Sequence, residues 1–147
     1  FAGGGKVAVR RIQAFLSVLG ETSDHVSENR LHVVVAAPAA DEKVEEYSQK
    51  GLLLWKKRKF LPEDVDKADF VIAATDDREL NQQIVKLCRN MGIPVNDAGE
   101  KENCDFYFPG IAVQGDLVAG VTASGKDHKK TRQVTEAVRR LLKEEGE

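Results

Sequence analysis

The sequence predicts an α/β protein, a parallel β-sheet followed by a smaller α+β segment, and three observations lead to this prediction. Residues 3–8 read Gly-Gly-Gly-Lys-Val-Ala, a small-residue turn from a strand into a helix. Apolar runs then alternate with stretches of helical periodicity up to residue 96, the pattern of βαβ units. Beyond residue 103, two apolar runs flank a glycine-led turn, which is typical of a hairpin. We therefore expect a Rossmann-type domain over residues 1–110 and a hairpin-and-helix segment over residues 111–147.

The opening glycines form the G-x-G-x-x-A pattern that lets a backbone turn approach a pyrophosphate. Gly3 suits a tight turn, Gly5 removes the side chain where a phosphate would come close, and Ala8 lets the helix pack near the sheet. The first N–H groups of the helix, with Lys6 and Val7 at its entrance, would then face the phosphates. Glycine clusters also occur in plain turns, so the pattern alone allows either interpretation.

A helix is expected directly after the glycines, because apolar residues recur there on one helical face. These residues are Ala8, Ile12, Phe15, Leu16 and Leu19. Only Phe1 and Ala2 stand before the glycines, so the strand that should lead into the turn is nearly absent. We expect that the sequence begins inside the domain and that most of this strand lies upstream.

The middle of the chain supplies the other strands of the predicted sheet. They are expected at residues 31–37, 52–55, 70–74 and 93–96. Pro38 should end the first of them, because it has no N–H to donate, and Asp41 should cap a short helix. Residues 75–77, Thr-Asp-Asp, should cap a longer helix that ends at Gly92.

Composition limits the classes of function. The 147 residues are 41% hydrophobic and carry a net charge of −2, so no basic field predicts a nucleic-acid partner. No apolar run approaches the length of a membrane span. Cys88 and Cys104 form neither a disulfide framework nor a paired metal motif, so we predict no metal site and a reduced, cytoplasmic setting. His25 stands in a polar stretch, residues 20–29, and is interpreted as a loop histidine.

Three motifs occur in a fixed order along the chain. They are residues 3–8 with Arg10 and Arg11, residues 73–77 with Leu80 and Asn81, and residues 103–109. The ordered set resembles the precorrin-2 dehydrogenase/ferrochelatase module of siroheme synthases, over nearly the whole chain except residues 20–29. The resemblance implies a Rossmann domain, then a segment through which two chains interlock. It also implies NAD⁺-dependent oxidation of precorrin-2 to sirohydrochlorin and, in many members, insertion of Fe²⁺ to give siroheme.

The resemblance also implies where NAD would bind. The glycine turn would hold the pyrophosphate, and Pro38 and Ala39 would lie beside the adenosine ribose. Dinucleotide-binding folds usually have an acid at this place, and this sequence has none before Asp41. The preference for NAD over NADP therefore rests on the resemblance alone. Thr75 and Asp76 would lie at the carboxyl edge of the sheet, as helix caps, as ligand contacts or as both.

The family's catalytic aspartate is missing from its expected place. Siroheme synthases typically carry it three residues after the asparagine that closes the fifth strand, and counting from Asn96 gives Gly99. A base is needed because loss of hydride must be matched by loss of a proton, and metal insertion must strip the pyrrole N–H protons. Asp97 and Glu100 are the neighbouring candidates, each of them a replacement base or an ordinary loop acid. His128 is a third candidate, either a proton acceptor or a polar residue before the last helix.

The favoured hypothesis is a homodimeric precorrin-2 dehydrogenase that binds NAD and tetrapyrrole. Dimerisation is expected because a hairpin and one helix are too small to bury their own apolar faces. Two alternatives stay open. A non-enzymatic NAD-sensing module would usually show an acid at the end of the second strand and would not need the motif at residues 104–109. A degenerate family member that binds tetrapyrrole without chemistry is the reading that Gly99 favours.

Overall fold

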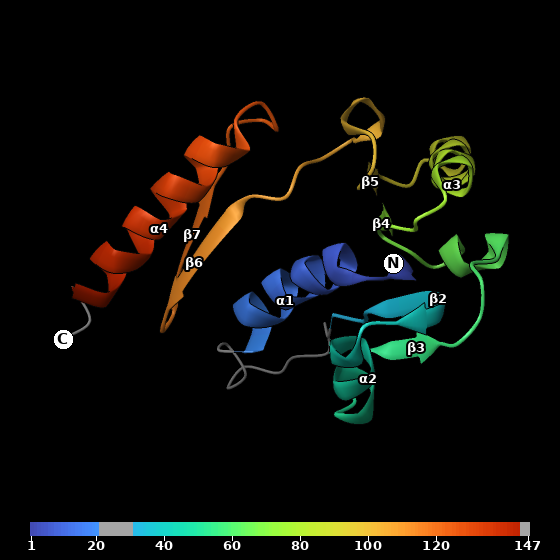
Figure 1. Cartoon of the computed structure of the whole chain (residues 1–147), viewed down its shortest axis with the longest axis horizontal. Coiled ribbons are helices and arrows are strands. Elements are labelled where there is room, and N and C mark those ends of the chain that lie inside the picture. The colour runs from blue at the N-terminus through green and yellow to red at the C-terminus, as the bar shows by residue number, and fades with distance from the viewer. Residues whose placement is uncertain (21–30, 145–147) are drawn as a thin grey trace. The chain divides into compact units, whose positions relative to one another are not determined.

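The computed structural model describes residues 1–20 and 31–144, and these form two compact units (Figure 1). The first unit contains residues 1–12 and 31–106, and the second contains residues 13–20 and 107–144 of the described chain. The chain therefore leaves the first unit within its first helix, belongs to it again from Leu31, and leaves it a second time after Phe106. The predicted polar loop with His25 falls almost wholly outside the described residues.

The first unit is built on a five-stranded parallel sheet with the strand order β3-β2-β1-β4-β5. Its strands are β1 (Ala2–Gly4), β2 (Val34–Ala40), β3 (Leu54–Lys56), β4 (Val71–Ala73) and β5 (Val95–Asp97). The predicted α/β class and parallel sheet are confirmed. Val35, Ile72 and Val95 are almost completely buried, as expected of strands covered on both faces.

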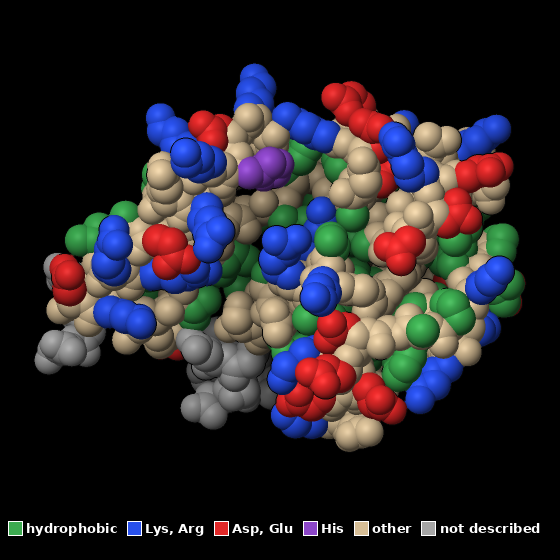
Figure 2. All heavy atoms as spheres, viewed as in Figure 1, with side chains coloured by type: hydrophobic (Ala, Val, Ile, Leu, Met, Phe, Trp, Pro, Cys, Tyr) green, Lys and Arg blue, Asp and Glu red, His purple; other side chains and the backbone are tan. Residues whose placement is uncertain are grey.

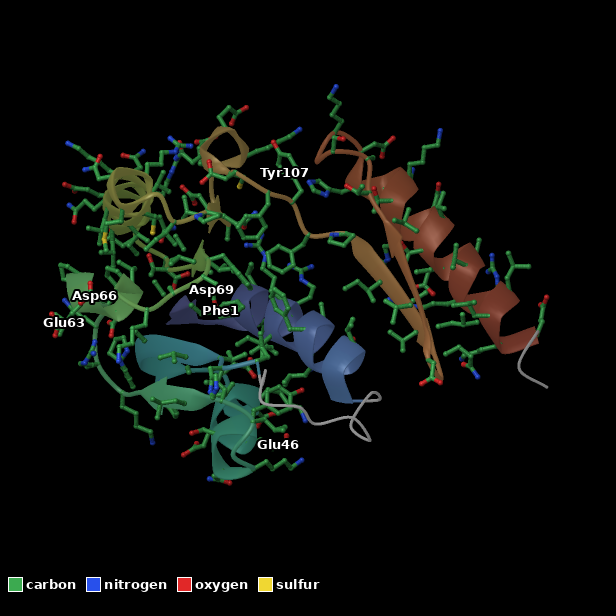
Figure 3. The ribbon with its side chains drawn as sticks, turned by 180° about the vertical axis from the view of Figure 1, so that it is seen from behind. Phe1, Glu46, Glu63, Asp66, Asp69 and Tyr107 are labelled. Carbon is green, nitrogen blue, oxygen red and sulfur yellow. The ribbon has the colours of Figure 1, made fainter. Side chains whose placement is uncertain are left out.

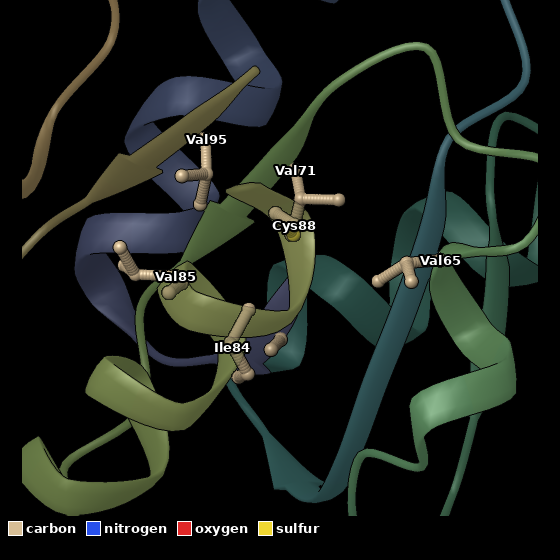
Figure 4. Close-up of a cluster of buried hydrophobic side chains, with 8 residues drawn as sticks. Val65, Val71, Ile84, Val85, Cys88 and Val95 are labelled. Carbon is tan, nitrogen blue, oxygen red and sulfur yellow. The ribbon is translucent and has the colours of Figure 1, made fainter. Parts of the chain in front are cut away.

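Helices and short 3₁₀ turns connect these strands. They are α1 (Lys6–Gly20), α2 (Glu42–Gln49), η2 (Pro62–Val65), α3 (Arg78–Met91) and η3 (Lys101–Asn103). Ile84, Val85 and Cys88 on the inward side of α3 pack with Val71 and Val95 in the hydrophobic core (Figure 4). Cys88 thus serves as a small buried apolar residue.

The helix ends follow the predicted local signals. Asp41 caps α2 by accepting the Lys43 N–H at 3.0 Å, and Gly92 ends α3 with a left-handed φ of 70°. Glu46 on α2, labelled in Figure 3, bonds to both Lys43 and Lys50 at 2.6 Å. These short-range pairs support a helix of only eight residues.

The first strand, Ala2–Gly4, is three residues long in the described chain, and the expectation that more of it lies upstream stays a prediction. Ala2 pairs with β2 on one side and with β4 on the other, so residues 2–4 form the centre of the sheet. Gly3 therefore lies within a strand, with a φ of 95°, and not in the tight turn that we expected. Glycine is required at this position because a Cβ there would lie 2.2 Å from the carbonyl oxygen of Ala74.

The second strand begins and ends three residues later than predicted, so it does not end at Pro38. It continues to Ala40, because the register shifts between the pairs Ala2–Ala36 and Gly4–Ala40. Four steps along β2 thus match two steps along β1, and the resulting bulge accommodates a residue that has no N–H. Asp41 consequently comes directly after the strand.

The second unit contains the predicted hairpin and final helix. β6 (Gly110–Gln114) pairs antiparallel with β7 (Leu117–Val121), and Gly115 has the positive φ, 53°, that the turn requires. Helix α4 (His128–Glu144) lies close against β6, since a Cβ on Gly110 would come within 2.0 Å of the Thr135 hydroxyl oxygen. Within residues 1–20 and 31–144, no helix combines the length and apolar character needed to cross a membrane.

Candidate functional site

The carboxyl ends of the parallel strands meet at one edge of the first unit's sheet. Gly5 follows β1, Asp41 follows β2, Thr75 lies just beyond β4, and Asp97 is the last residue of β5. Ligands of open α/β sheets bind at this edge, where the strand order changes direction. All four residues belong to the same compact unit, so the site can be described within it.

The turn from β1 into α1 is open at Gly5. The Gly5 carbonyl accepts the Val9 N–H at 3.0 Å, so the first helical bond starts there. Lys6 and Val7 are exposed, whereas Ala8 is completely buried against the sheet as predicted. A Cβ on Gly5 would meet no protein atom within 4 Å. Packing of the protein therefore does not require glycine here, and the helix N-terminus beside it is the kind of place where phosphate groups bind.

The turn after β4 is held by side chains from α3. Asp77, and not Asp76, caps this helix by accepting the Leu80 N–H at 3.0 Å. The Thr75 hydroxyl donates to Asn81 Oδ1 at 2.6 Å and accepts the Asp77 N–H at 3.2 Å. Asp76 is exposed at the edge of the sheet. The Thr75 side chain thus shapes the turn, and Asp76 is the exposed acid beside it.

Asp97 is held more firmly than the sequence indicated. We expected it to project from a loop, but β5 begins two residues later than predicted and includes it, with only 4% of the residue exposed. Its carboxylate accepts the Gly99 N–H at 2.9 Å and the Asn103 side-chain amide at 3.1 Å. A Cβ on Gly99 would lie 3.5 Å from Asp97 Oδ1. The Asp97 carboxylate therefore borders the space that a side chain at position 99 would enter.

Two polar residues, Arg11 and Asn96, form a hydrogen-bonded pair near Asp97. The Arg11 guanidinium on α1 donates to Asn96 Oδ1, and the Asn96 amide donates to the Phe106 carbonyl at 2.7 Å. Burial lowers the pKa of Arg11. In the sequence, Arg11 belongs to the first of the three ordered motifs and stands on the inward half of an amphipathic helix.

Cys104 also contacts the end of β5. Its thiol donates to the Asp97 carbonyl oxygen at 3.1 Å. Burial raises the pKa of the Cys104 thiol, so it is protonated near pH 7 and acts as a donor. This supports the interpretation of Cys104 as a structural residue.

Glu100 and His128, the other candidate bases, occupy different settings. Glu100 is half-buried and pairs with Arg78 at 3.0 Å. A hydrogen bond with Glu102 raises the pKa of Glu100, and the same bond lowers the pKa of Glu102. His128 is the exposed first residue of α4, in the second unit. The structure thus brings Asp97 and Glu100 to one sheet edge and assigns His128 to the other unit.

Pro38 and Ala39 are exposed near the end of β2, so both can reach a ligand at the sheet edge. On the face shown in Figure 2, basic and acidic side chains are interspersed and form no single basic field. This mixture fits the net charge of −2.

Comparison with known proteins identifies relatives of the whole described fold. A family model described as "Putative NAD(P)-binding" matches residues 1–110. The siroheme biosynthesis protein met8 of Schizosaccharomyces pombe is 37% identical over 130 residues, which are 86% of this chain and 45% of that protein. Precorrin-2 dehydrogenase of Bacillus subtilis is 28% identical over 141 residues, 96% of this chain and 80% of that protein.

The similarity extends to longer proteins and to a solved structure. A siroheme synthase of Photorhabdus laumondii is 33% identical over 95% of this chain, which is 27% of that protein. The solved structure of SirC, a precorrin-2 dehydrogenase, matches with a TM-score of 0.73 and 25% identity, covering 95% of this chain and 62% of the other. The chain spans less than half of the fungal relative and about a quarter of the siroheme synthase.

The open space at Gly5 yields the first prediction. Gly5→Asp should weaken NAD⁺ binding by at least about tenfold, because a carboxylate would stand where the pyrophosphate binds. Gly5→Ala should weaken it less, since it adds only a methyl group. Titration calorimetry on folded variants measures both dissociation constants.

Gln133→Asp is a control for the Gly5 variants, because it adds the same side chain to an exposed position on α4. It should leave NAD⁺ binding unchanged. Equal affinity of wild type and Gly5→Asp would show that the pyrophosphate binds elsewhere.

Proposed function

This chain belongs to the NAD(P)-binding family, and we propose that it oxidises precorrin-2 to sirohydrochlorin with NAD⁺ as the hydride acceptor. The observation that carries the proposal is the open turn at Gly5, which lies at the same sheet edge as the buried carboxylate of Asp97. A site for a dinucleotide and a fixed acid are the two parts that such an oxidation needs. The relatives named for precorrin-2 dehydrogenase and siroheme biosynthesis support the choice of substrate.

In this proposal NAD⁺ supplies the hydride acceptor, and the chain binds it, orients it and removes a proton. The first N–H groups of α1, beside Gly5, bind the pyrophosphate. The Thr75 turn and Asp76 line the middle of the site, and Asp97 accepts the proton that leaves the macrocycle. Insertion of Fe²⁺ into sirohydrochlorin, the finer part of the proposal, would use the same acid, because the pyrrole N–H protons must leave as the metal enters.

Asp97 suits the role of proton acceptor better than Glu100 does. Two donors fix its position, the Gly99 N–H and the Asn103 amide, and each carboxylate oxygen keeps a lone pair for a further bond. A fixed acid loses little orientational freedom in the transition state. Glu100 instead accepts a hydrogen bond from the largely exposed Arg78 and shares one with Glu102.

Replacing Asp97 tests this assignment. Asp97→Asn should lower dehydrogenase turnover by roughly 10² to 10⁴, the usual effect of removing a positioned base, while NAD⁺ affinity barely changes. Glu100→Gln should keep turnover near the wild-type rate. The reaction is followed by the absorbance of sirohydrochlorin formed from precorrin-2 and NAD⁺, and addition of Fe²⁺ tests for siroheme.

Asn103→Ala separates the chemical role of Asp97 from its structural one. The variant removes one brace from the Asp97 carboxylate but leaves the acid in place. It should lose much less activity than Asp97→Asn. If Asp97→Asn keeps full turnover, Asp97 is not the base. If the wild type is inactive and Gly99→Asp gains activity, the chain is a degenerate member of the family and the enzyme proposal fails.

Asp41 supports a preference for NAD over NADP. Because β2 continues to Ala40, an acid does follow the second strand, contrary to the sequence-based expectation. The Asp41 N–H donates to the Gly4 carbonyl at 2.8 Å, which ties the acid to the glycine turn. Its carboxylate would accept a ribose 2′-hydroxyl and repel a 2′-phosphate. An acid at this place is also usual in NAD-sensing modules, so Asp41 does not distinguish an enzyme from a sensor. Measured turnover of precorrin-2 makes that distinction.

Asp41→Asn is a sharp test, because asparagine also caps helices and so preserves the start of α2. The ratio of kcat/KM for NAD⁺ to that for NADP⁺ should fall by about tenfold, which corresponds to about 1.4 kcal/mol of discrimination. Glu42→Gln removes a charge from the adjacent residue and should change the ratio much less. An unchanged ratio in Asp41→Asn would remove Asp41 from the ribose site.

The second unit supports a homodimer. Large apolar side chains remain exposed on its hairpin and helix: Leu117, Val118, Val134 and Leu141 are between 41% and 62% exposed. A single described chain thus leaves both elements with uncovered apolar surface, as the sequence analysis expected. A second copy of the chain would bury it.

Charge substitution on this surface tests the dimer. Leu117→Glu and Leu141→Glu should each shift the protein from dimer to monomer in sedimentation velocity at micromolar concentration, because a buried unpaired carboxylate is costly. Leu54→Glu is the matched control, since Leu54 is 55% exposed on β3 of the first unit. A wild-type chain that sediments as a monomer would refute the proposal.

A further inference from the structure

Asn81 is a buried amide in the apolar face of α3, and it is neither the proposed base nor part of the glycine turn. Only 2% of the residue is exposed, and its helical neighbours on that face, Ile84 and Val85, belong to the hydrophobic core. Burial of an amide without partners would cost several kcal/mol. Packing alone therefore does not explain why an asparagine stands at this buried position.

Among the residues that the structure describes, Thr75 is the partner in every hydrogen bond of the Asn81 side chain. Its Oδ1 accepts the Thr75 N–H at 3.2 Å and the Thr75 hydroxyl at 2.6 Å. Its Nδ2 donates to the Thr75 carbonyl at 3.1 Å. One buried side chain thus satisfies the backbone donor, the backbone acceptor and the hydroxyl of one turn residue.

The turn at Thr75 lies against β1, the strand that leads into the glycine turn. The Ala74 N–H donates to the Ala2 carbonyl at 2.8 Å. A Cβ on Gly3 would lie 2.9 Å from the Thr75 nitrogen, which shows how closely the two backbones approach. A displacement of the Thr75 turn would therefore disturb the strand that ends in the pyrophosphate site.

Asn81 also borders the loop that follows Asp97. A Cβ on Gly99 would lie 3.8 Å from Asn81 Nδ2 and 3.5 Å from Asp97 Oδ1. The same amide group thus contacts the Thr75 turn on one side and lies near Gly99, whose N–H binds Asp97, on the other. No other described side chain in the hydrogen-bond network links Thr75 with the surroundings of Gly99.

We infer that Asn81 is a positioning residue, which holds the Thr75 turn between the pyrophosphate turn and the Asp97 loop. The inference rests on the proposed function. Because hydride and proton leave the same substrate, the groups that receive them must be held at a fixed separation. Small errors in such placement reduce rates strongly.

Two variants at this position test the inference. Asn81→Ala removes all three bonds to Thr75. Asn81→Asp has nearly the same shape and keeps the two acceptor bonds, but it places an oxygen against the Thr75 carbonyl. In both, the KM for NAD⁺ should rise by about tenfold or more and kcat should fall, since the turn shifts relative to both neighbours.

Val85→Ala controls for loss of stability alone, because Val85 is buried on the same face of α3 and makes only packing contacts in the core. It should lower the unfolding temperature but leave the KM for NAD⁺ within twofold of wild type. Asn81→Asp serves as the informative variant if Asn81→Ala does not fold. Unchanged KM and kcat in a folded Asn81→Asp would overturn the inference.

Binding of NAD⁺ to the wild type, measured separately by calorimetry, distinguishes this inference from the proposed function. A wild type that neither binds NAD⁺ nor forms sirohydrochlorin overturns the proposed function, and the inference falls with it. A wild type that does both, together with an Asn81→Asp variant of normal KM and kcat, overturns the inference alone.

Discussion

The close approach of β1 to its two neighbours is the constraint on which the rest of the first unit depends. Gly3 leaves no room for a side chain beside the Ala74 carbonyl, and Gly4 leaves none beside the Ala40 side chain, 2.6 Å from where its Cβ would lie. Because both contacts are with the ends of strands, they bring the turns after β1, β2 and β4 together. The ligand edge of the sheet is thus a consequence of backbone packing at two glycines.

Acids and amides at this edge have two roles at once. Asp41, Asp77 and Asp97 each accept a backbone N–H at or shortly after the end of a strand, so each stabilises the turn that follows β2, β4 or β5. In the proposed function, Asp41 and Asp97 also contact the dinucleotide and its substrate. The proposal therefore gives these two residues a structural and a chemical role. For this reason a single alanine variant cannot separate the two roles.

Local signals in the sequence were sufficient for much of the fold. The alternation of apolar runs and helical periods predicted the parallel sheet, while Asp41, Gly92 and Gly115 marked a helix start, a helix end and the hairpin turn. Each of these depends on interactions within a few residues of chain, or on a backbone angle that glycine permits. Such features are determined by short-range physics and can be read from the sequence.

The tertiary structure alone decided the features that depend on distant partners. Pro38 is accommodated because β1 pairs with β2 in a shifted register, and Gly3 belongs to a strand because Ala74 approaches it from β4. The burial of Asp97 depends on Gly99 and Asn103, and Asn81 acquires a role only when α3 folds back onto Thr75. By itself the sequence determined the fold class and the residue types at the site. Which of those residues touch depends on pairings between segments far apart along the chain, and no local pattern encodes them.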